Sequence, residues 1–257
     1  MTGITEQRPT PGADAPATGR ISPGARADLK TIAYWLSLGA AAGGLGGALI
    51  GGIGGRLAML LLRFTSDDSV RGVESDDGFI MGRFSFFDTV QLVAVTVIMG
   101  AVVGLIVVAG RPFFPKRGMP FAWALAGAIT GGAILISPDG VDFTLLEPHW
   151  LAVSLFIAIP AIGAWLIAWL TELYPRFWWR KRKFTALAAL AAVPMIIIFP
   201  VALFALFVGA LWFLAMQWPA ARSMPAWQPA RIAAIIVFAI IVALGLLNLT
   251  SDVRAIV

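Results

Sequence analysis

The chain has 257 residues, of which 59% are hydrophobic and only 13% charged, and its mean hydropathy is +0.86. Apolar runs of about 18 residues or more recur along it, which is typical of a multi-pass membrane protein. The formal charge is +5, but the basic residues lie in short segments between apolar runs, which argues against a nucleic-acid partner. The chain contains no cysteine, which excludes disulfides, thiolate metal ligands and cysteine nucleophiles.

Residues 1–30 are rich in Pro, Thr, Ala and Gly without apolar periodicity. We predict a disordered cytoplasmic tail here, because such a segment cannot bury enough apolar surface to fold. The remaining residues, 31–257, predict an all-α polytopic membrane helix bundle with six spans. The spans cover approximately residues 32–62, 90–109, 121–136, 151–170, 187–211 and 232–247.

The basic residues predict how the spans are oriented. Thirteen Lys and Arg residues fall in the tail, after the second and fourth spans and at the C-terminus, against five in the other connections. The positive-inside rule therefore predicts that both termini are cytoplasmic. This count treats residues 185–217 as one long span kinked at Pro194 and Pro200; two spans would place the C-terminus outside.

The first span contains a stripe of glycines with an unbroken spacing of four. On a helix this spacing places the five residues on one face and lets another helix approach closely, as small-xxx-small rows do in membranes. The next row, Ala41, Leu45, Leu49, Ile53 and Leu57, is almost wholly bulky. The stripe predicts a glycine zipper that packs against a neighbouring helix or a second copy, and a glycine-lined solute path is the alternative. Its members are Gly39, Gly43, Gly47, Gly51 and Gly55.

A weak internal echo accompanies the first and third spans. Ser75-Asp76-Asp77-Gly78 follows the first span, and Ser137-Pro138-Asp139-Gly140 follows the third. Gly51 and Gly55 precede the first motif as Gly127 and Gly131 precede the second. A parallel duplication of a two-helix unit is one explanation, and ordinary turn chemistry is the other.

Polar side chains gather in two external acidic loops, residues 63–89 and 137–150. Carboxylate oxygens of this kind suit a divalent cation, but most acidic loops are simply solvated or paired with arginine. We take these residues as a candidate external polar cluster without assigning a metal or a catalytic residue. Its members are Arg56, Asp76, Asp77, Asp139, Asp142 and Glu147.

The sequence offers little support for an enzyme. His149 is the only histidine and has no partner at metal-ligand spacing, and no nucleophile elbow, phosphate loop or dinucleotide fingerprint is present. The predicted spans contain no acidic residue at mid-membrane depth, whereas ion-coupled transporters normally place ionisable groups there. We therefore expect neither catalysis nor a cofactor. A metal-dependent membrane enzyme using the loop aspartates is the least favoured hypothesis.

Several strings resemble a group of uncharacterised actinobacterial multi-pass integral membrane proteins. They are Gly55-Arg56-Leu57-Ala58-Met59, residues 65–68, residues 72–79 and residues 138–148. The resemblance covers roughly the first four spans. It implies a bacterial plasma membrane and no assigned activity, so it transfers no site residue.

We therefore expect a non-enzymatic accessory or scaffold protein of the membrane. Its partners would be the lipid bilayer and either a second copy or another membrane subunit. The alternative is a small-solute permease or channel, suggested by the thin glycine face and the external acids.

Overall fold

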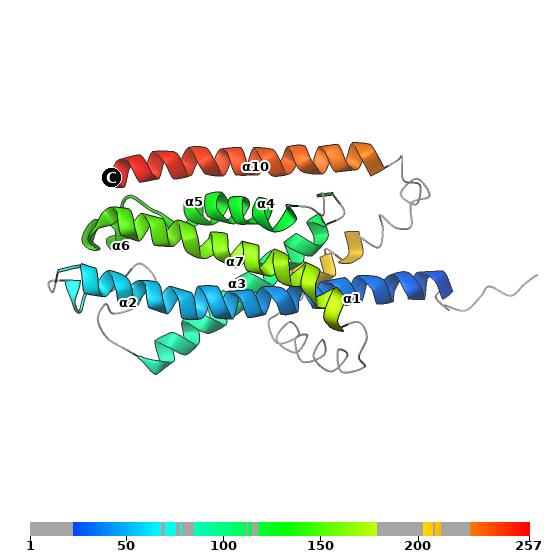
Figure 1. Cartoon of the computed structure of the whole chain (residues 1–257), viewed down its shortest axis with the longest axis horizontal. Helices are drawn as coiled ribbons and strands as arrows, with labels where there is room; N and C mark the ends of the chain where they lie inside the picture. The colour runs from blue at the N-terminus through cyan, green and yellow to red at the C-terminus, as the bar shows by residue number, and fades with distance from the viewer. Residues whose placement is uncertain are drawn as a thin grey trace, which may run out of the picture.

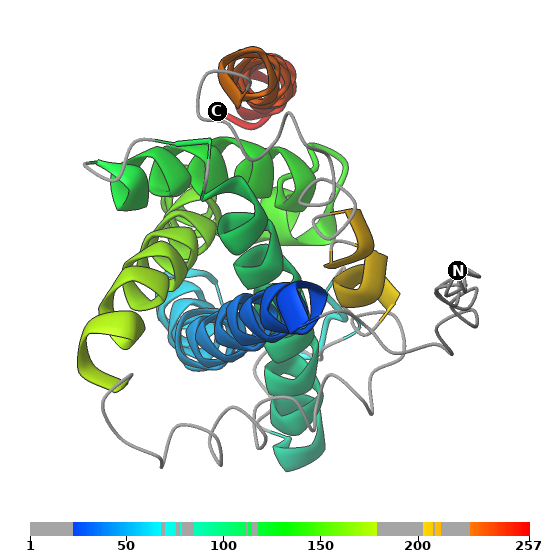
Figure 2. The same cartoon turned by 90° about the vertical axis from the view of Figure 1, so that its right-hand side faces the viewer.

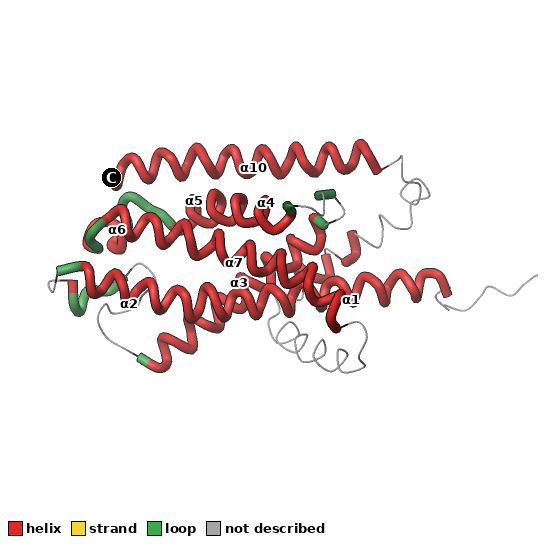
Figure 3. The backbone as a smooth tube through the Cα atoms, viewed as in Figure 1, coloured by secondary structure: helices red, strands yellow, loops and turns green. Residues whose placement is uncertain are grey.

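The computed structural model describes residues 23–67, 70–75, 78, 85–111, 113–114, 118–178, 203–207, 209–211 and 227–257. Within these residues all regular structure is helical (Figures 1 and 3). Four helices are long and apolar enough to cross a membrane: Leu29–Thr65, Phe86–Gly110, His149–Tyr174 and Arg231–Ile256. The prediction of an all-α, membrane-embedded protein is confirmed at this level.

The helices follow one another along the chain with short connections. The first is a continuous rod made of α1 (Pro23–Gly46), the π-helical η1 (Gly47–Gly54) and α2 (Gly55–Thr65). The third predicted span is the shorter apolar helix Met119–Leu135. The other elements are α3 (Phe86–Gly110), α4 (Met119–Ala126), the π-helical η3 (Gly127–Gly131), α5 (Gly132–Leu135), α6 (Val141–Leu145), α7 (His149–Trp178) and α10 (Trp227–Ile256).

Three predictions of extent meet these bounds. α1 begins at Pro23, inside the predicted tail, and residues 1–22 lie outside the described part. The external loops are shorter than expected, because α2 continues to Thr65, α3 begins at Phe86 and α7 begins at His149. The fifth predicted span, 187–211, lies outside the described residues except for 203–207 and 209–211.

We call the end of the bundle where α1 begins the proximal end and the opposite end the distal end. α3 and α7 end at the proximal end, and α4 and α10 begin there (Figure 1). The Arg111 guanidinium lies 4.1 Å from the Trp35 ring centroid, and Arg231 Nε donates a hydrogen bond to the Phe113 carbonyl at 3.0 Å. These two contacts place the start of α10 beside the end of α3.

The C-terminal end therefore lies at the distal end, opposite the start of α1. This differs from the predicted arrangement with both termini on one face, and from a single complete crossing by residues 187–211. α7 ends, and α10 begins, at the same end of the bundle, which one crossing between them would not permit. Hydropathy records how long an apolar segment is but not how many times it crosses, so the sequence count had no means of detecting this.

The closest helix pair is α1–η1 against α3, which run antiparallel. A Cβ added to Gly39 would lie 2.7 Å from the Gly104 carbonyl oxygen, and one added to Gly43 would collide with the Gly100 backbone. Gly47 and Gly51 face Thr96 in the same way. Four turns of the first helix therefore touch the α3 backbone directly, and only glycine fits there.

The bulky row of the first helix faces away from this contact. Leu45 and Leu49 are each 42% exposed, Ile53 is 55% exposed and Leu57 is 61% exposed. In a membrane these side chains meet lipid, which costs nothing because acyl chains are as apolar as leucine. One helix thus presents backbone to its neighbour and side chains to lipid.

Adjacent glycines test the α1–α3 contact. We expect Gly43→Ala to destabilise the fold by about 1–3 kcal/mol, because its methyl group would overlap the Gly100 backbone. Gly44→Ala is the matched control, since its Cβ would lie 3.6 Å from Val97 Cγ1, an ordinary contact. Thermal unfolding of both variants in detergent makes the comparison, and equal stabilities would contradict the packing described.

Candidate functional site

The two external loops meet at the distal end. The Ser66 hydroxyl, directly after α2, donates to the Glu147 carbonyl and accepts from the Glu147 N–H, both at 3.0 Å. One serine therefore satisfies both backbone groups of a residue that lies just before α7. This contact joins segments 81 positions apart in the chain.

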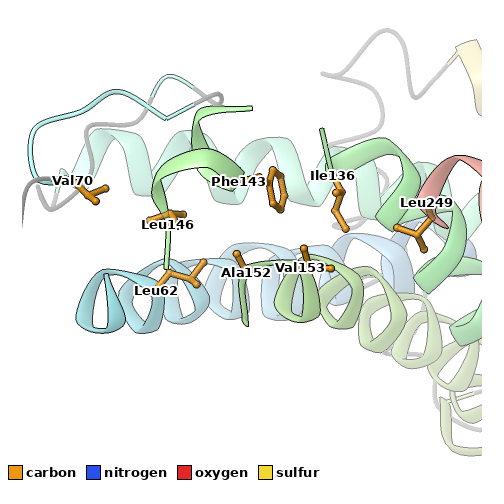
Figure 4. Packing of buried hydrophobic residues seen from close by; sticks show 8 residues of the cluster. All are labelled: Leu62, Val70, Ile136, Phe143, Leu146, Ala152, Val153 and Leu249. Carbon is orange, nitrogen blue, oxygen red and sulfur yellow. The ribbon is translucent and has the colours of Figure 1, made fainter. Parts of the chain in front are cut away.

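An apolar cluster lies beneath this junction (Figure 4). It takes residues from α2, both loops, α5, α7 and α10, so the distal ends of the described helices share one core. Phe143 stacks edge-on against Phe156 with ring centroids 4.9 Å apart. The buried members are Leu62, Val70, Ile136, Phe143, Leu146, Ala152, Val153 and Leu249.

The predicted polar cluster is brought together only in part. Asp142 lies in the first turn of α6, next to Phe143, and is 6% exposed. Asp139 and Glu147 are exposed, and Arg56 is partly buried in the first turn of α2. Asp76 and Asp77 lie outside the described residues. The loops therefore converge through apolar contacts and a serine bridge, with Asp139 and Glu147 on the solvent side.

The chemistry of the distal end is limited in the part of the chain that the structure describes. No group of three His, Asp or Glu side chains is placed there to hold a metal ion. His149 Nδ1 lies 3.0 Å from the Leu146 carbonyl, so the Nδ1–H donates to the turn that precedes α7. This hydrogen bond gives His149 a capping role in that turn.

A second polar cluster, at the proximal end, was missed in the sequence. Arg111 follows α3 and stacks on Trp35, whose ring is also in edge contact with Tyr34 at 5.2 Å. Burial lowers the pKa of Arg111, while the charges of Glu172 on α7 and of Tyr34 raise it. The aromatic pair suggested an interfacial belt, but nothing in the sequence joined it to Glu172, the one acid of the α7 span.

An aromatic cluster lies next to these residues. Phe114 and Phe238 have ring centroids 4.8 Å apart, and Trp123 lies 5.7 Å from Phe114 and 5.4 Å from Phe238. Together with the Arg231–Phe113 hydrogen bond, these rings attach the start of α10 to the turn before α4. Both proximal clusters therefore hold helix ends together at the depth where aromatic and basic residues meet the membrane interface.

Threonines supply hydroxyl groups within the described spans, and each of three satisfies its own helix. Thr96 donates to Leu92 O at 2.9 Å, and Thr130 donates to Ala126 O at 2.7 Å. Thr171, which is fully buried, donates to Ala168 O at 2.8 Å. Hydroxyls bonded in this way are turned away from any solute path.

Comparison with known proteins adds no assignment. No protein-family model, curated protein or solved structure matches the chain. The geometry itself therefore carries the functional argument.

The serine bridge between the loops gives a direct test. We expect Ser66→Ala to loosen the segment 141–149, because both backbone groups of Glu147 lose their partner at a net cost of about 1 kcal/mol. Ser154→Ala is the control, since that hydroxyl only donates to Trp150 O in its own helix. Hydrogen exchange should be faster in residues 141–149 of the first variant alone; unchanged protection there would exclude a bridging role.

The proximal stacking contact gives a second test. We expect Trp35→Leu to lower stability by about 0.5–2 kcal/mol, since Arg111 loses the ring face on which it rests. Trp150→Leu removes an indole that is 62% exposed at the distal end and should cost less. Thermal unfolding in lipid nanodiscs compares the two variants, and an equal loss would show that only general interfacial anchoring is involved.

Proposed function

We propose that the protein is a non-enzymatic accessory or scaffold protein of a bacterial plasma membrane. The observation that carries the proposal is the contact between α1–η1 and α3, in which glycine backbone touches backbone over four turns. A seam of this kind leaves no room for a solute between the two helices. It builds a rigid support on which the joined distal loops are displayed.

The distal surface is the part of this scaffold that suits a partner. Asp139 and Glu147 are exposed on loops that Ser66 and the apolar cluster hold in place. Fixed carboxylates favour a partner with basic residues and raise its rate of encounter. A second copy of the chain or another membrane subunit would bind here or through the lipid-facing helices.

The basic residues favour a cytoplasmic proximal end. Lys30, Arg111 and Arg231 lie there, and the run at Arg180–Lys183 follows α7 in the sequence. Arg231 moves to this side and Arg254 leaves it, compared with the arrangement expected from sequence. The positive-inside rule then places the start of α1 in the cytoplasm and the end of α10 on the external face.

The permease or channel alternative receives less support from the described residues. The hydroxyls of Thr96, Thr130 and Thr171 bond to their own helices, and the α1–α3 contact is filled by backbone. A continuous polar path would need groups facing a shared space between helices.

Association and solute flux together test the proposal. We expect light scattering of the detergent-solubilised protein, purified at native abundance, to show a mass above that of the 27.3 kDa chain after subtraction of detergent. The double variant Asp139→Asn with Glu147→Gln should shift this mass toward the single chain, because the exposed carboxylates are removed. Asp252→Asn, on α10 near the same end, is the control for a lost acidic charge.

Proteoliposomes decide between the two functions. We expect release of a small fluorescent anion and of K⁺ to equal that of protein-free liposomes. A monomeric protein with no effect of the double variant would contradict the scaffold proposal. Release above the protein-free rate would support the channel.

A further inference from the structure

The two glycine-rich helices contain the same short sequence. Residues 47–52 read Gly-Ala-Leu-Ile-Gly-Gly, and 80 positions later residues 127–132 read Gly-Ala-Ile-Thr-Gly-Gly. Both copies begin a π-helical segment, since η1 starts at Gly47 and η3 starts at Gly127. This register is one helical turn away from the match of Gly51 and Gly55 with Gly127 and Gly131.

The three shared glycines make equivalent contacts. A Cβ on Gly47 would strike the Thr96 and Gly100 backbone, and a Cβ on Gly127 would strike Pro160 and Ala164. The partner positions are 64 residues apart on α3 and α7. The matching pairs are Gly47–Thr96 with Gly127–Pro160, Gly51–Thr96 with Gly131–Pro160, and Gly52–Val93 with Gly132–Ile157.

Glycine is absent from the second copy where the first copy does not need it. A Cβ on Gly44 would make only ordinary contacts, and one on Gly54 would meet only its own helix. The residues 80 positions later are Ala124 and Ile134. Sequence identity between the copies is thus concentrated where the two helices touch.

The connections agree with the same alignment. The Ser-x-Asp-Gly motifs at residues 75–78 and 137–140 are 62 positions apart. α3 begins at Phe86 and α7 begins at His149, 63 positions apart. Turn, helix start and packing partner therefore shift by almost the same amount, as expected when one unit is copied with small insertions.

We infer that residues 42–110 and 122–174 are two copies of one two-helix unit that run in the same direction. Each unit has a glycine-rich helix with a π-helical segment and a long apolar helix that returns along it. Two parallel copies of this kind are related by a rotation about an axis along the membrane normal. α10 lies outside the repeat.

The repeat explains where α10 packs. In the first unit, Ile50 lies against Gly163 of α7, which belongs to the second unit. The position equivalent to Ile50 is Thr130, and it lies against Gly245 of α10 instead. α10 therefore takes, on the second unit, the place that α7 takes on the first.

A saturation scan of the full-length chain tests the repeat. Every residue in 42–55, 89–104, 122–135 and 153–168 is substituted singly, and the abundance of folded protein in the membrane is measured for each variant. We expect the tolerance profiles of 42–55 and 122–135 to correlate best at a shift of 80. The profiles of 89–104 and 153–168 should correlate best at a shift of 64.

Shifts of 76 and 84 are the internal controls, because they move the profile by one helical turn and keep the amphipathic period. Substitutions at Gly47 and Gly127 should reduce abundance together, and those at Gly44 and Ala124 should both be mild. A best correlation at a control shift, or no correlation above that between α1 and α10, would overturn the inference.

Discussion

The structure depends on the distance between two backbones. α1–η1 and α3 approach until glycine Cα atoms face carbonyl oxygens, with no side chain between them. In water such a helix would be weakened, since each interior glycine costs about 0.5–1 kcal/mol relative to alanine. In lipid the helix cannot exchange its hydrogen bonds for water, so the glycines cost less and dispersion contacts along the seam stabilise the pair.

The seam also explains the division of the first helix into a packing face and a lipid face. This division could be predicted from the four-residue spacing of glycine and the parallel row of leucine and isoleucine. The partner could not be, because a small-xxx-small stripe fits any helix with small residues at matching depth. α3 supplies Thr96, Gly100 and Gly104 at that spacing, a row that only becomes informative once the two helices are known to be antiparallel.

The candidate site was predicted in composition but not in geometry. Sequence reasoning placed Asp139, Asp142 and Glu147 in an external loop, yet their burial differs, since Asp142 is in the core beside Phe143 and the other two face outward. The Ser66–Glu147 bridge and the Arg111–Trp35 stack join positions far apart in the chain. No local pattern encodes such contacts. The direction of α10 was missed for the same reason, as it is set by Phe238 and Arg231 meeting the turn before α4.

Rigid packing in one unit and looser packing in the other have a common cause in the sequence. Gly43 lets α1 lie directly on Gly100, whereas the residue 80 positions later is Trp123, which faces Ala164 and Ala168 within a cluster of larger side chains. The indole keeps α4 and α7 further apart at the proximal end and creates the apolar surface on which Phe238 rests. One change of residue size at equivalent positions thus makes room for a helix that the first unit has no place for.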